Sequence, residues 1–319
     1  MAEVAEKTPA TASDEVAAGT PAVRTVELTK RFGRTVALAG LSMTVPRGEV
    51  FGFLGPNGAG KTTAVKLLLG LLTPSSGEGW LLGKRLGDLG ARRRIGYLPE
   101  LFRYQAWLSA AEVLALHCEL APLPRSSWKD EIRTVLDTVG LADRANDKIG
   151  TFSKGMQQRL GLGAALLGEP ELVFLDEPTS ALDPVGRHDV REIIRGLASR
   201  GAAVFLNSHL LSEVEQVCDR VAVVDHGRVI ASGTMDDLLS GTAVRLRVAG
   251  LTPADKNKLS SFGRLDDEGE SLTFTNLAAD RVPELVSSIV AMGGRVYEVA
   301  PRHQTLEDRF LQLLEDEEK

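Results

Sequence analysis

A glycine-rich stretch followed by a lysine and a threonine has the plainest chemistry in this sequence. Residues 55–62 read Gly-Pro-Asn-Gly-Ala-Gly-Lys-Thr and fit the phosphate-loop pattern G-x-x-x-x-G-K-[ST]. Its glycines let the backbone wrap an oxyanion with the N–H groups inward, because a Cβ there would collide with phosphate. Lys61 offers a cation to the β- and γ-phosphates, and the Thr62 hydroxyl can ligate Mg²⁺. The residues expected to contact the nucleotide are Gly55, Pro56, Asn57, Gly58, Ala59, Gly60, Lys61, Thr62 and Thr63.

Two acidic residues end a strongly apolar run later in the chain. Residues 172–177 read Leu-Val-Phe-Leu-Asp-Glu, which is typical of a buried strand that ends in two carboxylates. Successive side chains of an extended backbone face different directions, so Asp176 can serve Mg²⁺ while Glu177 addresses a water. Glu177 is the candidate for polarising a water in line with the γ-phosphate. The alternative, a strand that ends in solvated acids, is disfavoured by the phosphate loop elsewhere in the chain.

Regular elements must position both stretches. A buried strand is expected before the loop, and a helix after it, at residues 64–69, would point its N-terminal dipole at the phosphates. From residue 172 strands and helices alternate, which argues for a parallel sheet with helices on both faces. The expected elements are strands Leu172–Leu175, Ala203–Leu206, Val221–Val224 and Val229–Ala231, with helices at Val185–Ser199 and after Ser208.

The segments before this alternation have other patterns. Residues 1–22 have no apolar periodicity and are expected to form a disordered tail. Residues 109–149 read as a helical insertion, in which capping boxes at Ser109 and Ser127 open two helices. Ser153 is placed to cap a third helix, which runs to about Leu167. The strands expected in this part are Val23–Leu28, Ser42–Val45, Glu49–Leu54, Trp80–Leu82 and Ile95–Leu98.

The pattern changes again near Ser240. Residues 241–319 are expected to form a small accessory α+β domain, for which a split βαβ unit is a candidate topology. It carries no chemical motif. The expected elements are strands at residues 244–248, 272–274 and 296–299 and helices at residues 254–262, 281–292 and 305–314.

Composition limits the class of protein. The 319 residues suggest about two domains, and 43% hydrophobic with 25% charged residues is ordinary for a soluble globular chain. The longest apolar stretches are too short to span a membrane, and the N-terminus lacks the apolar core of a signal peptide. A net charge of −6 offers no electrostatic footprint for nucleic acid. Cys118 and Cys218 have no metal-binding spacing and are expected to be reduced thiols in helices.

A third motif, taken with the phosphate loop and the acidic strand, indicates a family resemblance. It lies at residues 152–159, which read Phe-Ser-Lys-Gly-Met-Gln-Gln-Arg. Residues 23–240 resemble the ATP-binding cassette family, whose signature is L-S-G-G-Q followed by x-Q-R. Ser153, Gly155, Gln158 and Arg159 match, whereas Lys154 and Met156 depart from it. By itself this stretch is a capped helix N-terminus, either an anion site or an ordinary cap.

The resemblance implies a fold and further site residues. The fold would be an α/β P-loop NTPase cassette, with a mixed sheet core, a β-subdomain and a helical subdomain at about residues 101–168. Ser153 and Gly155 would press on the γ-phosphate held by a second copy. Asp183 would bridge the two sites, although it also fits an ordinary helix cap.

Three more positions follow from the resemblance. His209 would contact the γ-phosphate as the switch histidine. Phe32 would stack on adenine, with a core position as the alternative. Glu100 stands where the family has a glutamine, and its carboxylate can still ligate Mg²⁺.

The function that the resemblance implies is the ATPase subunit of a bacterial exporter, most similar to the ABC-2 type and its daunorubicin-resistance group. Two copies would close head to tail on two Mg·ATP and drive a separate permease from the cytoplasmic face of the inner membrane. One alternative is a soluble ATPase of the same superfamily that acts on ribosomes or DNA. Another is a binding module with little hydrolysis, although such a module would not need Glu177. The transported substrate does not follow from the sequence.

Overall fold

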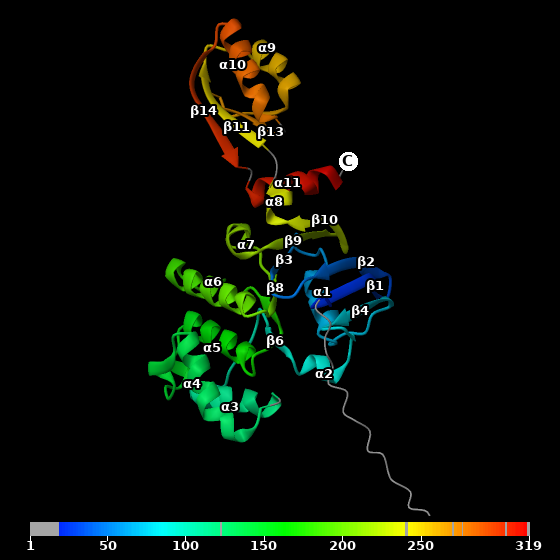
Figure 1. The fold of residues 1–319 in the computed structure, drawn as a ribbon, viewed down its shortest axis with the longest axis vertical. Coiled ribbons are helices and arrows are strands. Elements are labelled where there is room, and N and C mark those ends of the chain that lie inside the picture. Colours follow the sequence, from blue (N-terminus) through cyan, green and yellow to red (C-terminus); the bar gives the residue numbers. More distant parts are fainter. Residues whose placement is uncertain are drawn as a thin grey trace, which may run out of the picture.

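The computed structural model describes residues 19–121, 123–239, 242–269, 271–275, 277–303 and 305–317. Within these residues the chain forms a large region around a central sheet and a smaller region with its own small sheet, which lies beyond β9 and β10 along the longest axis (Figure 1). None of the described helices is long and apolar enough to cross a membrane.

The central sheet has six strands in the order β10-β9-β3-β8-β7-β6. Five run parallel, and β10 pairs antiparallel with β9. The parallel sheet predicted from the alternating pattern is therefore confirmed, with a final hairpin at its edge. The strands are β3 (Val50–Leu54), β6 (Ile95–Leu98), β7 (Leu172–Asp176), β8 (Ala203–Asn207), β9 (Arg220–Asp225) and β10 (Arg228–Thr234).

Both faces of this sheet are buried, because alternate side chains enter two separate cores. Phe51, Phe174 and Phe205 pack on one face, with the Phe174 and Phe205 ring centroids 5.1 Å apart. Helix α1 (Lys61–Leu68) and a second sheet cover that face, while α5, α6 and α7 cover the other (Figure 1). The three helices are α5 (Lys154–Leu166), α6 (Pro184–Ser199) and α7 (Leu211–Val217).

The covering sheet is antiparallel, in the order β2-β1-β4-β5, and its first strands are longer than predicted. Its strands are β1 (Val23–Phe32), β2 (Thr35–Val45), β4 (Ser76–Leu81) and β5 (Lys84–Arg85). Ala22 was predicted to lie in the disordered tail, yet it is buried and donates its N–H to Val45 O at 2.9 Å. Residues 1–18, most of the predicted tail, lie outside the described residues.

The helical insertion contains α3 (Ala110–Leu120) and α4 (Trp128–Thr138), and a short α2 (Leu89–Arg92) that was not predicted precedes it. The capping box at Ser109 is confirmed, because Ser109 and Glu112 exchange both hydrogen bonds. The box at Ser127 is wrong. Ser127 has helical backbone angles at the end of a 3₁₀ turn, so its hydroxyl donates back to Pro124 O at 2.9 Å.

The second region has the chain order β-α-β-β-α-β and the sheet order β12-β13-β11-β14, the topology of a split βαβ unit. It has its own core, which includes Leu246, Phe274 and Ile289. Strand β12 was missed in the sequence. The elements are β11 (Thr242–Ala249), α9 (Pro253–Lys258), β12 (Arg264–Asp267), β13 (Ser271–Thr275), α10 (Val282–Ala291) and β14 (Arg295–His303).

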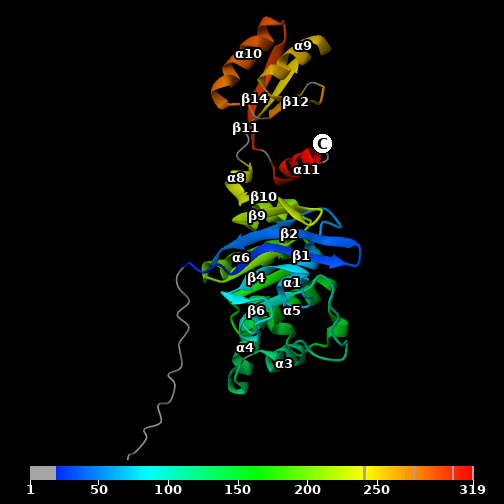
Figure 2. The ribbon, with the colours of Figure 1, turned by 90° about the vertical axis from the view of Figure 1, so that its right-hand side faces the viewer.

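The last helix, α11 (Leu306–Glu317), returns to the large region instead of joining the small sheet (Figures 1 and 2). It packs on α7, α8 (Met235–Leu239) and β10. Leu306 is 1% exposed in the same core as Val214 and Val217, and its N–H donates to Glu215 Oε2 at 2.9 Å. The division of the chain at residues 240 and 241 stays a prediction.

Candidate functional site

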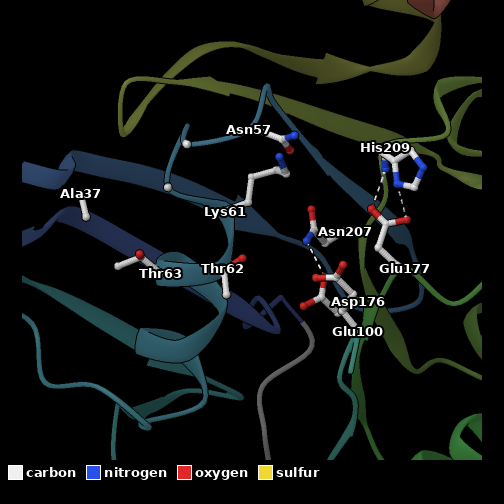
Figure 3. A pocket seen from close by; sticks show the side chains of 12 residues that line it. Ala37, Asn57, Lys61, Thr62, Thr63, Glu100, Asp176, Glu177, Asn207 and His209 are labelled. Atoms are coloured by element: carbon white, nitrogen blue, oxygen red, sulfur yellow. Dashed lines mark hydrogen bonds and ion pairs between the residues drawn. The ribbon is translucent and has the colours of Figure 1, made fainter. Parts of the chain in front are cut away.

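A cleft of about 520 Å³ lies where β3, β7 and β8 end, next to the start of α1 (Figure 3). Ligands of open α/β sheets bind at this carboxyl edge, because the loops and helix N-termini converge there. The structure brings together most of the predicted site residues and adds Ala37 and Asn207. The lining residues are Ala37, Asn57, Gly58, Gly60, Lys61, Thr62, Thr63, Glu100, Asp176, Glu177, Asn207 and His209.

The packing of the phosphate loop requires its glycines for reasons that add to the predicted one. A Cβ on Gly55 would overlap the carbonyl oxygen of Val224, and one on Gly60 would overlap that of Ala37. At Gly58 the space is open, and the requirement is its left-handed φ of 86°. Gly55 and Gly60 therefore let the loop pack against neighbouring strands before any phosphate is bound.

Lys61 begins α1 and lies along the loop. Its Nζ donates to Gly55 O at 2.6 Å and to Pro56 O at 3.0 Å. Gly55, Pro56 and Ala59 do not line the cleft themselves; they shape the loop through their backbone. Burial lowers the pKa of Lys61, and the charges of Glu177, Asp176 and Glu100 oppose this shift.

The acidic side chains that line the cleft outnumber the basic ones, which limits the ligands that can bind there. Three carboxylates, Glu100, Asp176 and Glu177, face one lysine. This excess of negative charge would repel a polyphosphate alone and favours one that is accompanied by a divalent cation.

The metal-binding side of the cleft centres on Asp176 at the end of β7. Its carboxylate is buried, and Asn207 Nδ2 donates to its Oδ1 at 2.5 Å. Burial raises the pKa of Asp176, and Glu100 and Glu177 raise it further. No three His, Cys, Asp or Glu side chains of the described residues form a metal cluster. Mg²⁺ needs only one or two carboxylates when phosphates and waters complete its shell, so Asp176, Glu100 and Thr62 fit an ion that arrives with nucleotide.

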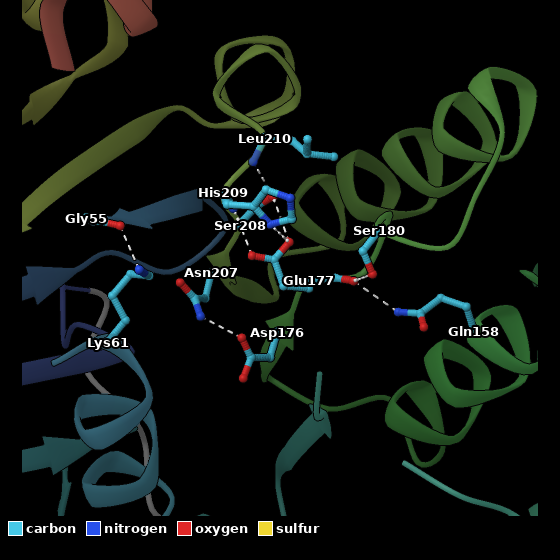
Figure 4. Close-up of polar contacts among 10 residues, drawn as sticks. All are labelled: Gly55, Lys61, Gln158, Asp176, Glu177, Ser180, Asn207, Ser208, His209 and Leu210. Carbon is cyan, nitrogen blue, oxygen red and sulfur yellow. Dashed lines mark hydrogen bonds and ion pairs between the residues drawn. The ribbon is translucent and has the colours of Figure 1, made fainter. Parts of the chain in front are cut away.

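Several hydrogen bonds hold Glu177 in place at the end of β7 (Figure 4). Its Oε1 accepts from His209 N at 2.8 Å, and its Oε2 lies 2.8 Å from His209 Nδ1 and 3.4 Å from Ser208 Oγ. Its backbone oxygen accepts from Gln158 Nε2 at 3.1 Å. Its φ of 53° is unusual for a residue with a side chain, and such strain gathers at functional sites.

Asn207 and Ser208 were missed as site residues. They end the apolar run of β8 directly before His209, just as Asp176 and Glu177 end that of β7. This parallel was a usable signal, because neighbouring parallel strands end at the same edge of a sheet.

Besides Gly55, Pro56 and Ala59, four predicted site residues do not line the cleft of their own chain. Ser153 caps α5, accepting from Met156 N at 3.2 Å, and Gly155 lies in the first turn. Asp183 caps α6, accepting from Gly186 N at 2.8 Å, so its structural role is confirmed. Phe32 is 48% exposed, which excludes the core position, and Lys30 Nζ lies 5.1 Å from its ring centroid.

Comparisons with known proteins agree with this geometry. The model of the ABC transporter family matches residues 38–180. An uncharacterized ABC transporter ATP-binding protein of Nostoc sp. is 42% identical over 287 residues, which cover 89% of this chain and 85% of the relative. The daunorubicin resistance ATP-binding protein DrrA3 of Streptomyces coeruleorubidus is 38% identical over 300 residues, covering 91% and 95%.

A solved structure described as the ATP-binding subunit of an ABC transporter matches with a TM-score of 0.64 and 32% identity, covering 69% of this chain and 92% of that one. The fold, the phosphate loop beside the paired acids, and these relatives agree: the chain belongs to the ABC transporter family, as an ATP-binding subunit with the P-loop NTPase fold.

Proposed function

We propose that this chain hydrolyses ATP in the presence of Mg²⁺ and drives an exporter whose permease is a separate polypeptide. One observation carries the proposal: Glu177, held by His209, shares a cleft with Lys61 and Asp176. The names of two relatives, a daunorubicin resistance ATP-binding protein and a Nod factor export ATP-binding protein of Rhizobium sp., support export as the work performed.

The residues of the cleft divide between binding and proton transfer. The loop N–H groups and Lys61 hold the β- and γ-phosphates, and Thr62, Asp176 and Glu100 hold the cation. Bound Mg²⁺ supplies positive charge that offsets the phosphates and the three carboxylates. Asn57 and Thr63 line the same cleft.

Glu177 acts as the general base. A water oxygen forms a bond to the γ-phosphorus, and the bond from that phosphorus to the β,γ-bridging oxygen breaks with its electron pair going to ADP. Glu177 takes the proton that the water loses, and inorganic phosphate leaves. His209 orients the Glu177 carboxylate through its backbone N–H and its ring, and the exposed part of the ring faces the cleft in which the γ-phosphate would lie.

The second half of the site comes from another copy of the chain. Ser153 and Gly155 stand at the exposed N-terminus of α5, away from the cleft of their own chain. A helix N-terminus binds anions, so this turn suits the γ-phosphate held by a head-to-tail partner. Gln158 of the same helix bonds the backbone of Glu177, which couples the signature turn to the base.

The permease would dock beside Glu100. Leu101 and Trp107, on the segment between Glu100 and α3, are 87% and 72% exposed. Phe102 of this segment packs over Gly161 of α5, so movement at Glu100 is passed to the helix that carries the signature. In this proposal the chain works on the cytoplasmic face of the membrane, which it reaches through the permease.

The permease proposal is tested with W107S, which we expect to lose co-purification with the permease while ATP hydrolysis by the isolated chain is kept. L89S is the matched control, because Leu89 is 65% exposed in α2, outside that segment. Equal retention of the permease by both variants would contradict the docking site.

The hydrolysis proposal is tested with E177Q. Gln keeps the shape and one acceptor oxygen but cannot take a proton, so we expect turnover to fall about 10²- to 10⁴-fold with nucleotide binding intact. The variant should also elute as a dimer with MgATP. K61A is the contrasting variant and should lose nucleotide affinity. Turnover of E177Q at the parent rate would remove the base from the proposal.

A further inference from the structure

Asn207 has a position that the proposed chemistry does not yet use. It is the last residue of β8, is 4% exposed and lines the cleft. Its backbone is fixed on both sides, in register with Asp176 on β7 and Phe53 on β3. Its side chain therefore stands at a point set by the sheet and not by a loop.

The two ends of its carboxamide differ. Nδ2 donates to Asp176 Oδ1 at 2.5 Å, which determines the orientation of the group, and Oδ1 is buried without a hydrogen-bond partner. Among the buried side-chain atoms described as unpartnered, this is the one that lines the cleft; the others belong to Arg47, Glu49 and Thr273. A buried carbonyl oxygen that accepts no hydrogen bond costs free energy, so we expect a hydrogen-bond donor next to Asn207 Oδ1.

The surroundings narrow the choice of donor. Asn207 lies between Lys61 and Asp176 (Figure 3). Phosphate oxygens and ionised carboxylates only accept hydrogen bonds. Lys61 Nζ donates two of its three N–H groups to loop carbonyls, and the proposed function assigns the third to the phosphates. A water bound to a divalent cation is a strong donor, and Mg²⁺ keeps several of its waters when it binds nucleotide.

We infer that Asn207 is a positioning residue for the cation: Nδ2 orients Asp176, and Oδ1 accepts a hydrogen bond from a water in the metal's coordination shell. The inference rests on the proposed binding of Mg·ATP. Residues that orient ligands in this way typically change metal affinity 10- to 100-fold when they are replaced.

The test uses the full chain with Mn²⁺ as the probe, whose binding in the presence of ADP is measured by electron paramagnetic resonance. In N207L, which has a similar volume and no polar atom, we expect Mn²⁺ affinity to fall about tenfold or more. ADP affinity in EDTA should stay within about twofold of the parent, because the loop and Lys61 are untouched. N207T, whose hydroxyl both donates and accepts, should lose less than N207L.

T273V is the matched control, because Thr273 Oγ1 is also buried without a partner but lies in the small sheet. We expect its Mn²⁺ affinity to be unchanged. Parent-like Mn²⁺ affinity in N207L would overturn the inference and leave an ordinary trapped water as the donor. Equal losses of ADP affinity without metal in N207L and N207T would overturn it as well, because they would show general damage. If the parent itself bound no Mn²⁺ with ADP, the proposed function would fail instead.

Discussion

Replacing Leu306 with alanine tests whether the C-terminal helix is part of the nucleotide-binding region. Leu306 is 1% exposed and packs in the core that contains Val214 and Val217 of α7. The change removes about 2 kcal/mol of transfer free energy at about 0.8 kcal/mol per buried carbon. The cavity left behind brings the expected loss to about 2–5 kcal/mol. Because α11 packs on the large region through α7, α8 and β10, part of this loss should appear as local detachment of the helix.

Leu311 gives a control in the same helix, because it is 54% exposed. L311A should change the free energy of unfolding by less than about 0.5 kcal/mol. The Leu→Ala change alters helix propensity equally at both positions, but only Leu306 is buried. Urea denaturation measures the global loss, and hydrogen exchange of the α11 amides measures the detachment. Equal effects of L306A and L311A in both measurements would refute the docking of α11 on α7.

The remaining predictions concern the phosphate loop, a helix cap and the thiols. G55A should lower affinity for a fluorescent ATP analogue at least tenfold, because its Cβ would overlap Val224 O. G58A meets open space and only its left-handed φ opposes the methyl group, so it should lose less; equal losses would contradict this account. S109A should lower the free energy of unfolding by about 1 kcal/mol and S127A by much less, because only Ser109 forms its cap; a urea titration compares them. Both cysteines are buried and burial raises their thiol pKa values, so they should react with a disulfide reagent only after denaturation, and fast labelling of the native chain would argue against this.

Much of the site was predictable because its motifs consist of residues that are close together in the sequence. The phosphate loop and the paired acids each need their residues adjacent in sequence, and each follows an apolar strand. Glu100 and His209 came from the family resemblance, and the structure places both in the cleft. The free thiols were also predicted, although Cys218 follows α7 and does not lie within it.

Other parts of the fold depended on local geometry that spacing does not reveal. Ser109 and Ser127 have the same pattern, yet only Ser109 has the extended backbone that a cap requires. Ala37 lines the cleft because β2 begins at Thr35, well before its predicted start at Ser42. Local propensity does not determine where a strand begins when its partner strand sets the length.

The amino-acid sequence by itself determined which chemical groups are present and which of them are neighbours along the chain: the loop with Lys61, the acids of β7, and the alternation that requires a parallel sheet. Only the tertiary structure decided that Asn207 turns its amide to Asp176, that His209 bonds Glu177, and that α11 returns to α7. These contacts join residues from 31 to 91 positions apart, and packing and strand register, which act through space, select them.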